Sequence, residues 1–282
     1  MLVEIYERLS QVYDYDWGQF SKRYVTLINH LLDERGIVRA DILDLACGTG
    51  TLAVELAKLG HRTLGIDVSP PMIEKARSKS IGLPNVCFQV QDIKDFVLED
   101  RFDLCACTFD SINYLLTGKD VRKMFDRIGA ALKQSGLFVF DSNTDRLYAN
   151  RHRGTHKREL GGESFVQRCR YDRLRREAIT TFEFSDGSVE IHGQRPYELT
   201  ELAPVLVDAG LRVVKTYAGF DERACDSDTE RLICVAEKER CVTTLKNVFT
   251  ERFADSGDRA NAHLCHAFQN SFEKSLGLPE MW

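Results

Sequence analysis

The sequence predicts an α/β fold with a doubly wound, mostly parallel sheet, and three observations support this prediction. Short apolar runs alternate with amphipathic segments between residues 41 and 141. These runs lack the polar alternation of a half-exposed sheet, as is typical of parallel strands that are covered on both faces. A turn rich in small residues, ACGTG at 46–50, joins the first run to the first amphipathic segment. Such a succession of strands and helices requires right-handed crossovers.

Five strands and three helices are predicted in this region. The strands cover residues 41–45, 62–67, 86–90, 102–107 and 136–140. The first helix carries apolar residues along 52–59 and ends at Gly60. The second begins with Ser69 as its N-cap, followed by a proline at its first position. The third carries an apolar stripe along 121–132 and is closed by Gly136.

The composition changes in the second half of the chain. Residues 146–177 hold ten Lys and Arg against four Asp and Glu. The following residues alternate polar and apolar around an SDGS turn at 185–188, which predicts an antiparallel hairpin. A helix that ends at Gly210 and two strands, within 211–220 and 231–238, are expected to complete the sheet as an antiparallel pair.

The overall composition is that of an ordinary globular protein, with 43% hydrophobic and 29% charged residues. Glu4, Glu7 and Arg8 interrupt any apolar core of an export signal, and no window approaches 18 uncharged apolar residues. Nine cysteines without a CxxC pair favour reduced thiols. We therefore expect a cytoplasmic protein without a membrane partner, and the net charge of −5 argues against a dedicated nucleic-acid binder.

The small-residue turn predicts a ligand site at the carboxyl end of the strands. A glycine-rich turn lets a ligand approach the backbone and meet the helix N-terminus. Gly48, Gly50 and Ala53 satisfy the dinucleotide fingerprint G-x-G-x-x-G/A, which alone is a weak signal. A dinucleotide oxidoreductase is therefore one alternative.

Three carboxylates favour a different ligand. Asp44 stands at the end of the first strand, where it would repel a pyrophosphate and attract a cationic group. Asp67 ends the second strand and can accept both hydroxyls of a ribose, and Asp92 follows the third strand, where it can bind an exocyclic amine. A ligand with a ribose, an adenine and an ammonium group but no phosphate fits these positions, and that ligand is S-adenosylmethionine.

Five segments also carry a resemblance. Three of them are DILDLACGTGTLAVELAKLGHRTLGIDVSPPMIEKAR (41–77), FDLCACTFDSINYL (102–115) and ALKQSGLFVFDSNT (131–144). They resemble the motifs of class I S-adenosylmethionine-dependent methyltransferases, although Ala46 replaces the first motif glycine. YERLSQVYDYDW (6–17) and HGQRPYELTELAPVLVDAGL (192–211) resemble a subgroup that acts on small molecules, including sugar-amine and glycine N-methyltransferases.

The resemblance covers about residues 5–237 and implies a Rossmann-like, seven-stranded sheet with helices on both faces. It also implies an antiparallel insertion after the fifth strand and a C-terminal helical extension. The expected segments are an N-terminal helical cap (1–40), the cofactor-binding half of the methyltransferase domain (41–145), an antiparallel insertion or lid (146–198), the completion of the sheet (199–237) and a helical tail (238–282). The insertion or the tail helices are candidates for a homodimer interface.

The resemblance further implies roles at the cofactor. Asp44 would balance the methionyl ammonium, directly or through water, and Asp67 would hold the ribose. Ala46, Gly48 and Gly50 would form the turn whose backbone lies against the methionine portion. The remaining cofactor residues would be Val68, Met72, Asp92, Ile93 and Thr108, with Met72 and Ile93 on either side of the adenine, Asp92 at its amine and Thr108 near the sulfonium. Each has a structural alternative: the three carboxylates are also suited to helix caps or a turn, and Met72 to the core.

Methyl transfer from a sulfonium is an in-line displacement, so the protein mainly holds the nucleophile about 3 Å from the methyl carbon. No metal is required, and a general base helps only when the nucleophile arrives protonated. The candidate catalytic residues are His192 and Tyr13, and the expected acceptor is a small polar molecule methylated on nitrogen or oxygen. The candidate substrate-binding residues are Phe109, Asp110, Asn113, Tyr114, Arg195 and Tyr197. His192 is equally suited to a satisfied position on a strand face, and Arg195 to an ion pair with Glu198 or Glu201.

Two rival functions remain open from the sequence. The basic segment 146–177 could bind RNA as a methyl acceptor, in which case binding would weaken steeply with salt. Alternatively, the chain could bind S-adenosylmethionine without turnover, as a scaffold whose tail recruits a partner. Neither an N/D-P-P-Y turn nor a Pro-Cys pair follows the fourth strand, where the residues are TFDS. Small-molecule methylation is therefore the favoured hypothesis.

Overall fold

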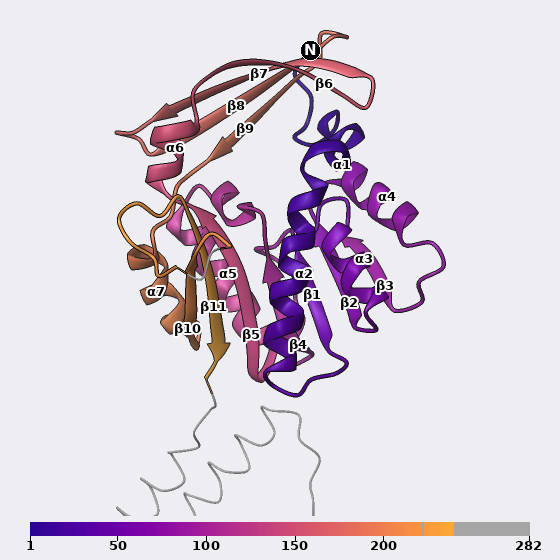
Figure 1. Cartoon of the computed structure of the whole chain (residues 1–282), viewed down its shortest axis with the longest axis vertical. Helices are drawn as coiled ribbons and strands as arrows, with labels where there is room; N and C mark the ends of the chain where they lie inside the picture. The colour runs from indigo at the N-terminus through magenta and orange to yellow at the C-terminus, as the bar shows by residue number, and fades with distance from the viewer. Residues whose placement is uncertain (221–222, 240–282) are drawn as a thin grey trace, which may run out of the picture. The chain divides into compact units, whose positions relative to one another are not determined.

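The computed structural model describes residues 1–220 and 223–239, which belong to one compact unit. The helical tail expected for 238–282 lies outside the described residues beyond Glu239. The described part of the chain contains a seven-stranded sheet and a separate four-stranded sheet (Figure 1). Within it, no helix is both long enough and apolar enough to cross a membrane.

The seven-stranded sheet has the order β10-β11-β5-β4-β1-β2-β3. Its strands are β1 (Asp41–Leu45), β2 (Arg62–Asp67), β3 (Val86–Val90), β4 (Phe102–Cys107), β5 (Leu132–Asn143), β10 (Leu211–Ala218) and β11 (Arg231–Lys238). Strands β1 to β5 pair in parallel, whereas β11 is antiparallel to both β5 and β10. The predicted mostly parallel α/β sheet and its antiparallel closing pair are confirmed.

Helices cover both faces of this sheet. They are α2 (Gly18–Asp33), α3 (Thr51–Lys58), α4 (Pro70–Lys79), α5 (Gly118–Ala131) and α7 (Leu199–Asp208), and the shorter helical segments are η1 (Leu9–Gln11), α1 (Tyr13–Asp16), η2 (Ser111–Tyr114) and α6 (Asp145–Arg151). Neighbouring residues of one strand enter different cores: Ile42 packs with α2 and α3, and Leu43 with α5 and α7. Both side chains are fully buried, which explains why the strands show no polar alternation.

One predicted boundary is wrong, because the third helix does not extend to Gly136. Helix α5 ends at Ala131, since Leu132 already has an extended backbone and pairs with Phe102 of β4. Gly136 lies inside β5, where an added Cβ would come within 2.8 Å of the Lys133 carbonyl oxygen. Crowding inside the strand, and not the end of a helix, therefore requires glycine there.

The start of α4 follows the prediction. The side chain of Ser69 accepts a hydrogen bond from the Met72 backbone N–H at 3.5 Å, and Pro70 occupies the first helical position. This cap matters for the site, because it fixes the chain direction directly after Asp67 at the end of β2.

The four-stranded sheet is antiparallel, in the order β6-β7-β8-β9. Its strands are β6 (Gly154–Leu160), β7 (Glu163–Asp172), β8 (Glu177–Phe184) and β9 (Val189–Gln194), and β8 and β9 form the predicted hairpin. Figure 1 shows this sheet lying across the end of the larger sheet at which the parallel strands finish. The insertion after β5 thus covers the edge at which the ligand site is expected.

The N-terminal residues join the two sheets. Leu2 forms a bridge with Val189 of β9, and Leu9 and Val12 pack against Phe182 of β8. Helix α2 then continues along the larger sheet. Residues 1–17 are therefore held against the four-stranded sheet before the chain enters the larger one.

Candidate active site

The turn between β1 and α3 has three residues in the left-handed backbone region: Ala46 at φ 51°, Gly48 at 55° and Gly50 at 75°. The two glycines have different physical reasons. A Cβ on Gly50 would lie 2.7 Å from the Ala76 side chain and 2.6 Å from that of Phe88, so this glycine serves internal packing. A Cβ on Gly48 would meet nothing within 4 Å, which leaves open space for a ligand at Gly48 alone.

Asp67, at the end of β2, holds this turn in place. One carboxylate oxygen accepts the Gly48 backbone N–H at 2.8 Å, and the other accepts the Ser69 N–H at 2.8 Å. Burial raises the pKa of Asp67, and the two backbone donors partly offset that effect. Each oxygen keeps a second lone pair, so the carboxylate can still accept hydroxyl groups of a ligand.

Asp44, at the end of β1, has an unusual environment. Its side chain is 2% exposed, and its Oδ2 atom has no hydrogen-bond partner. Burial raises the pKa of this carboxyl to about 8, against an opposing backbone hydrogen bond from Ala53. A buried carboxylate oxygen without a partner is costly, and a ligand ammonium group placed beside it would remove that cost. The carboxylate oxygens at this edge of the sheet therefore fit a cationic ligand.

The other expected cofactor residues lie along the same edge of the sheet. Asp92 accepts a hydrogen bond from the Lys94 backbone N–H at 2.9 Å and forms an ion pair with the Lys94 side chain at 3.4 Å. Met72 and Ile93 are buried, at 1% and 9% exposure, whereas Val68 is 56% exposed. Thr108 is also buried, and its carbonyl oxygen accepts a hydrogen bond from Ser111 at 2.9 Å.

The turn after β4 is strained and held by charge. Phe109 and Asp110 both have positive φ, 63° and 51°, which costs bulky or branched residues about 1–2 kcal/mol each. The Asp110 N–H donates to the buried Asp141 at 3.0 Å. Arg231 of β11 donates to Asp110 at 2.9 Å and also contacts Asp141, and Gln194 of β9 donates to Asp110 at 2.8 Å.

These contacts define a charge cluster of Asp110, Asp141 and Arg231, in which Asp141 is fully buried and the other two side chains are largely buried. Burial raises the pKa of Asp141, and the guanidinium of Arg231 opposes that rise. For Arg231 itself burial is unfavourable, but the two carboxylates outweigh it and raise its pKa. The charge cluster thus holds the strained turn where the fourth strand meets the ligand edge.

The N-terminal residues close over the glycine-rich turn. Asp14 of α1 accepts a hydrogen bond from Thr49 at 2.6 Å and pairs with Lys79 of α4 at 2.8 Å. Beside it, Tyr13 stacks on Trp17 at 5.6 Å and meets the edge of Phe109 at 6.4 Å between ring centroids. Tyr13 therefore lies between the N-terminal cap and the turn after β4.

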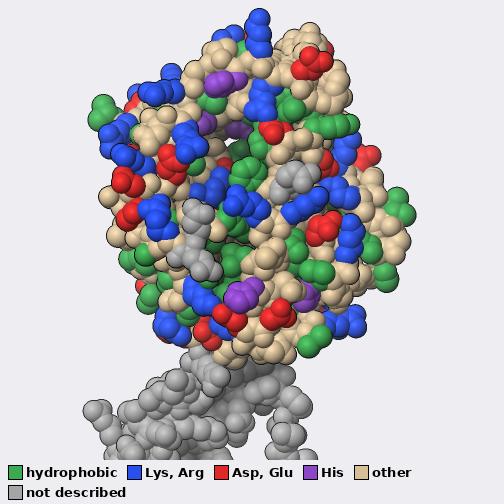
Figure 2. All heavy atoms as spheres, viewed as in Figure 1, with side chains coloured by type: hydrophobic (Ala, Val, Ile, Leu, Met, Phe, Trp, Pro, Cys, Tyr) green, Lys and Arg blue, Asp and Glu red, His purple; other side chains and the backbone are tan. Residues whose placement is uncertain are grey.

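His192 of β9 is 2% exposed and uses both ring nitrogens. Nδ1 lies 3.0 Å from the Tyr114 hydroxyl, and Nε2 lies 3.0 Å from a carboxylate oxygen of Glu190. The Tyr114 hydroxyl in turn accepts a hydrogen bond from the Tyr6 hydroxyl at 2.7 Å. His192 is thus separated from accessible space by two tyrosines. Figure 2 shows that the surface is hollowed below the four-stranded sheet, where histidine and hydrophobic side chains border an opening.

Three predicted substrate residues have structural contacts instead. Asn113 is fully buried, and its amide donates to the carbonyl oxygens of Asn143 at 2.9 Å and Arg195 at 2.7 Å. Tyr197 is buried in the core and donates its hydroxyl to the Leu115 carbonyl oxygen. Arg195 pairs with Glu201 at 3.1 Å, the ion pair that was its structural alternative. The structure does not bring these three side chains to the hollow.

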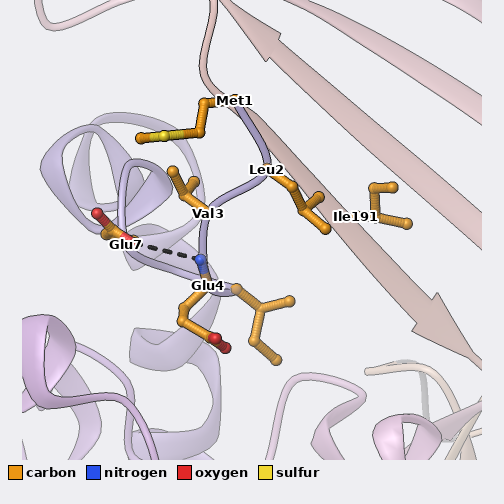
Figure 3. A pocket seen from close by; sticks show the side chains of 7 residues that line it. Met1, Leu2, Val3, Glu4, Glu7 and Ile191 are labelled. Carbon is orange, nitrogen blue, oxygen red and sulfur yellow. Dashed lines mark hydrogen bonds between the residues drawn. The ribbon is translucent and has the colours of Figure 1, made fainter.

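A separate pocket of about 470 Å³ lies on the outer side of β9. Figure 3 shows Ile191 facing it together with the first residues of the chain. Successive side chains of a strand point to opposite faces, so Ile191 points away from the side on which Glu190 and His192 lie. This pocket is therefore distinct from the site at the strand ends.

Residues that the sequence analysis missed complete the site. They are Tyr6, Asp141, Glu190, Gln194 and Arg231. One signal could have indicated part of this set: Glu190, His192 and Gln194 alternate in VEIHGQ and are all buried. Three polar residues on the inward side of one strand require polar partners. Tyr6 and Arg231 carry no comparable local signal.

Comparisons with known proteins agree with this geometry. Residues 42–136 match the model of a methyltransferase domain. A Geobacillus sp. (strain WCH70) protein that carries the name of a methyltransferase is 31% identical over 210 residues, covering 70% of this chain and 84% of the relative. The chain belongs to the class I S-adenosylmethionine-dependent methyltransferases. Its cofactor is S-adenosylmethionine, as the sequence analysis predicted.

Two further comparisons describe this methyltransferase. It is 27% identical over 214 residues to the glycine/sarcosine N-methyltransferase of Aphanothece halophytica, covering 74% of this chain and 79% of that one. A crystal structure of an S-adenosylmethionine-dependent methyltransferase from Clostridium acetobutylicum superposes with a TM-score of 0.71, at 24% identity, over 83% of this chain and 99% of that one. The Rossmann-like fold is therefore shared with a solved methyltransferase.

Proposed function

We propose that this methyltransferase transfers the methyl group to the nitrogen of a small polar amine. The observation that carries this proposal is the cluster of aromatic rings that the N-terminal cap forms with η2 and the turn after β4. Tyr6 lies 6.0 Å from Tyr13 and 5.9 Å from Tyr114, and Tyr13 lies 6.4 Å from Phe109, measured between ring centroids. Aromatic faces attract a cationic group, and the phenol hydroxyls can bind its N–H groups. The likeness to a glycine/sarcosine N-methyltransferase supports the same acceptor class.

At the cofactor, bound S-adenosylmethionine would supply an electrophilic methyl group on sulfur. We propose that Asp44 balances the methionine ammonium, because its partnerless buried oxygen fits a cation, and that Asp67 accepts the ribose hydroxyls. Gly48 would allow the close backbone approach, since the space beside it is open. Met72, Ile93, Asp92, Val68 and Thr108 stay the proposed contacts of the adenine and sulfonium ends.

The structure weakens the RNA alternative. Seven of the ten Lys and Arg of 146–177 form ion pairs with carboxylates of the same chain: Arg146, Arg151, Arg158, Arg168, Arg173, Arg175 and Arg176. Phosphate binding depends on basic groups that are free to replace counterions. The excess of positive charge that suggested RNA is therefore largely compensated within the protein.

The test is an acceptor panel with purified protein and S-adenosylmethionine. It contains glycine, sarcosine and an amino sugar, each beside the analogue that carries a hydroxyl in place of the amine, and a short RNA. We expect S-adenosylhomocysteine release and a methylated product with at least one amine, and none with its hydroxyl analogue or the RNA. Methylation of the hydroxyl analogues alone would contradict the proposal. Binding of S-adenosylhomocysteine without turnover on any acceptor would favour the scaffold hypothesis.

A further inference from the structure

An unbroken hydrogen-bonded chain leads from the partly exposed Tyr6 to the fully buried Glu190. The Tyr6 hydroxyl donates to the Tyr114 hydroxyl at 2.7 Å, the Tyr114 hydroxyl lies 3.0 Å from His192 Nδ1, and His192 Nε2 lies 3.0 Å from Glu190. We call these four residues the tyrosine–histidine relay. Its members come from the N-terminal segment, η2 and β9.

The hydrogen atoms of the relay can be arranged in only one direction when His192 is neutral. Both oxygens of Glu190 accept hydrogen bonds from backbone N–H groups of Tyr6, Arg8 and Leu9. Glu190 therefore acts as the acceptor toward His192 as well, and Nε2 of His192 carries the ring hydrogen. Nδ1 is then the acceptor for the Tyr114 hydroxyl, which has no second hydrogen to donate. Tyr114 must therefore accept from Tyr6, and the lone pairs of the Tyr6 oxygen are left for a donor in the hollow.

Exposure changes along the relay in the same direction. Tyr6 and Tyr114 keep part of their surface accessible, whereas His192 is 2% exposed and Glu190 is fully buried. Burial raises the pKa of both phenols well above the ordinary value. The tyrosines therefore stay protonated and can pass a proton on without acting as phenolate bases.

Tyr6 is also held under strain at the outer end. Its backbone has a φ of 65°, which is unusual for a bulky residue and is typical of functional positions. The Tyr6 backbone N–H donates to Glu190 at 3.0 Å, the Leu9 N–H donates to it at 2.8 Å, and the Arg8 N–H is a third donor. The same carboxylate that pairs with His192 thus fixes the segment that carries Tyr6. The Tyr6 ring stands perpendicular to the His192 ring, at 4.8 Å between centroids.

We propose that this relay removes a proton from an acceptor amine that arrives as an ammonium ion, an inference that rests on the proposed function. One N–H bond of the ammonium breaks, and its proton passes to the Tyr6 oxygen. The Tyr6 hydroxyl proton moves to Tyr114, and the Tyr114 hydroxyl proton moves to His192 Nδ1. The imidazolium formed is paired with the Glu190 carboxylate, and the amine keeps the electron pair that attacks the methyl carbon. No oxidation or reduction occurs, and the proton returns to solvent through the same hydroxyls after product release.

This assignment gives Tyr6 the contact with the acceptor and makes His192 and Glu190 positioning residues that act through the tyrosines. General base assistance contributes roughly 10²–10⁴-fold in rate. It also predicts a signature that a purely structural network would not produce. The relay is needed only while the acceptor is protonated, so its loss should matter less as the pH approaches the pKa of the amine.

The first test needs no acceptor. Nitrogen-15 NMR of the histidine rings, in the full chain with S-adenosylhomocysteine added, reports which nitrogen of His192 carries hydrogen, and the spectrum of His192→Gln assigns the signal. We expect Nε2–H and a bare Nδ1 in the wild type at neutral pH. A hydrogen on Nδ1 would reverse the direction of the relay and overturn the proposal.

The second test uses the amine that the panel shows to be methylated. Tyr114→Phe keeps the ring and removes the hydroxyl link, and Tyr171→Phe is the matched control, because that hydroxyl donates to Asp145 away from the relay. We expect Tyr114→Phe to lower kcat by about 10²-fold below the pKa of the amine, with KM changed little and activity recovering as pH rises. The control should follow the wild type. An equal loss at every pH, or no loss, would overturn the relay while leaving amine methylation intact.

If no amine is methylated, the proposed function fails, whereas the direction of the relay is tested independently. In that case the NMR result still separates the two, because it reports the direction of the hydrogen bonds without turnover. A variant that does not fold is recognised from its circular dichroism, and Tyr6→Phe then provides a second break in the same chain with the same expected pH dependence.

Discussion

The two sides of the active site are built in different ways. On the cofactor side, Asp67 binds backbone groups of Ser69 and Gly48, which are 2 and 19 residues away in the sequence. On the proposed acceptor side, two hydrogen bonds of the relay join residues that are 78 and 108 positions apart, and the Tyr6 backbone N–H donates to Glu190, 184 positions away. One side is local and the other depends on the whole fold.

The difference also concerns charge. The cofactor edge leaves Asp44 with a partnerless oxygen, which a ligand can satisfy. On the acceptor side, Asp141 and Asp110 pair with Arg231, and Glu190 pairs with His192, although one oxygen of Asp141 also lacks a hydrogen-bond partner. Mutations on the two sides should therefore have different effects. Changes at Asp44 or Asp67 should weaken cofactor binding, whereas changes in the charge cluster or the relay should lower stability or the rate of methyl transfer.

The largest expected effect is on the acceptor side. Arg231→Met should lower the free energy of unfolding by roughly 3–5 kcal/mol, because it leaves the buried Asp141 without its guanidinium partner. Denaturant unfolding measures this effect. The matched control is Arg212→Met, whose ion pair with Glu237 is exposed and spans 3.6 Å, and which should change stability by less than about 1 kcal/mol. Similar losses in the two variants would show that the charge cluster has no special role.

The next effect is on the cofactor side. Asp67→Ala should weaken S-adenosylhomocysteine binding by roughly 1–3 kcal/mol, because hydrogen bonds to the ribose and to the glycine-rich turn are both lost. Titration calorimetry measures the affinity. Asp103→Ala is the control. Asp103 pairs with Lys133 at 3.0 Å and lies at the start of β4, at the opposite edge of the sheet from the carboxyl ends of the strands. Unchanged affinity in Asp67→Ala would remove the ribose assignment.

A third expected effect is a pH dependence at Asp44. Its pKa rises from 3.8 to about 8 on burial, so the ligand-free protein loses stability as pH rises through that interval, while the carboxyl ionises without a partner. A ligand ammonium favours the ionised form, so binding releases a proton and affinity should rise with pH below about 8. Asp44→Asn should flatten both trends. Calorimetry in buffers of different ionisation enthalpy measures the proton release, and pH-independent affinity of the wild type would contradict the ammonium assignment.

Much of the fold could be predicted because its signals are local. The strand ends, the Ser69 cap and the hairpin around the SDGS turn each depend on a few neighbouring residues. The prediction failed at Gly136, where glycine usually ends a helix but here avoids a clash with the Lys133 carbonyl oxygen inside β5. A glycine is informative only when the conformation or the crowding that requires it is known.

The candidate site divides in the same way. Asp44, Gly48 and Asp67 were predicted because strand order and a turn bring them to one edge. The alternating polar residues of β9 were visible in the sequence, but their partner Tyr6 was not. Asn113 and Tyr197 were assigned to substrate from a resemblance, yet they fill hydrogen-bonding positions in the interior.

The sequence by itself determined the α/β class and the family, and it placed Asp44 and Asp67 at the carboxyl ends of neighbouring strands, because hydrophobic period, turn chemistry and strand ends are properties of short segments. Only the tertiary structure decided that His192 lies behind two tyrosines, and that Arg231 pairs with both Asp110 and Asp141. The physical reason is that hydrogen bonds and ion pairs act over a few ångströms of space. Only folding brings residues that are a hundred or more positions apart within that range.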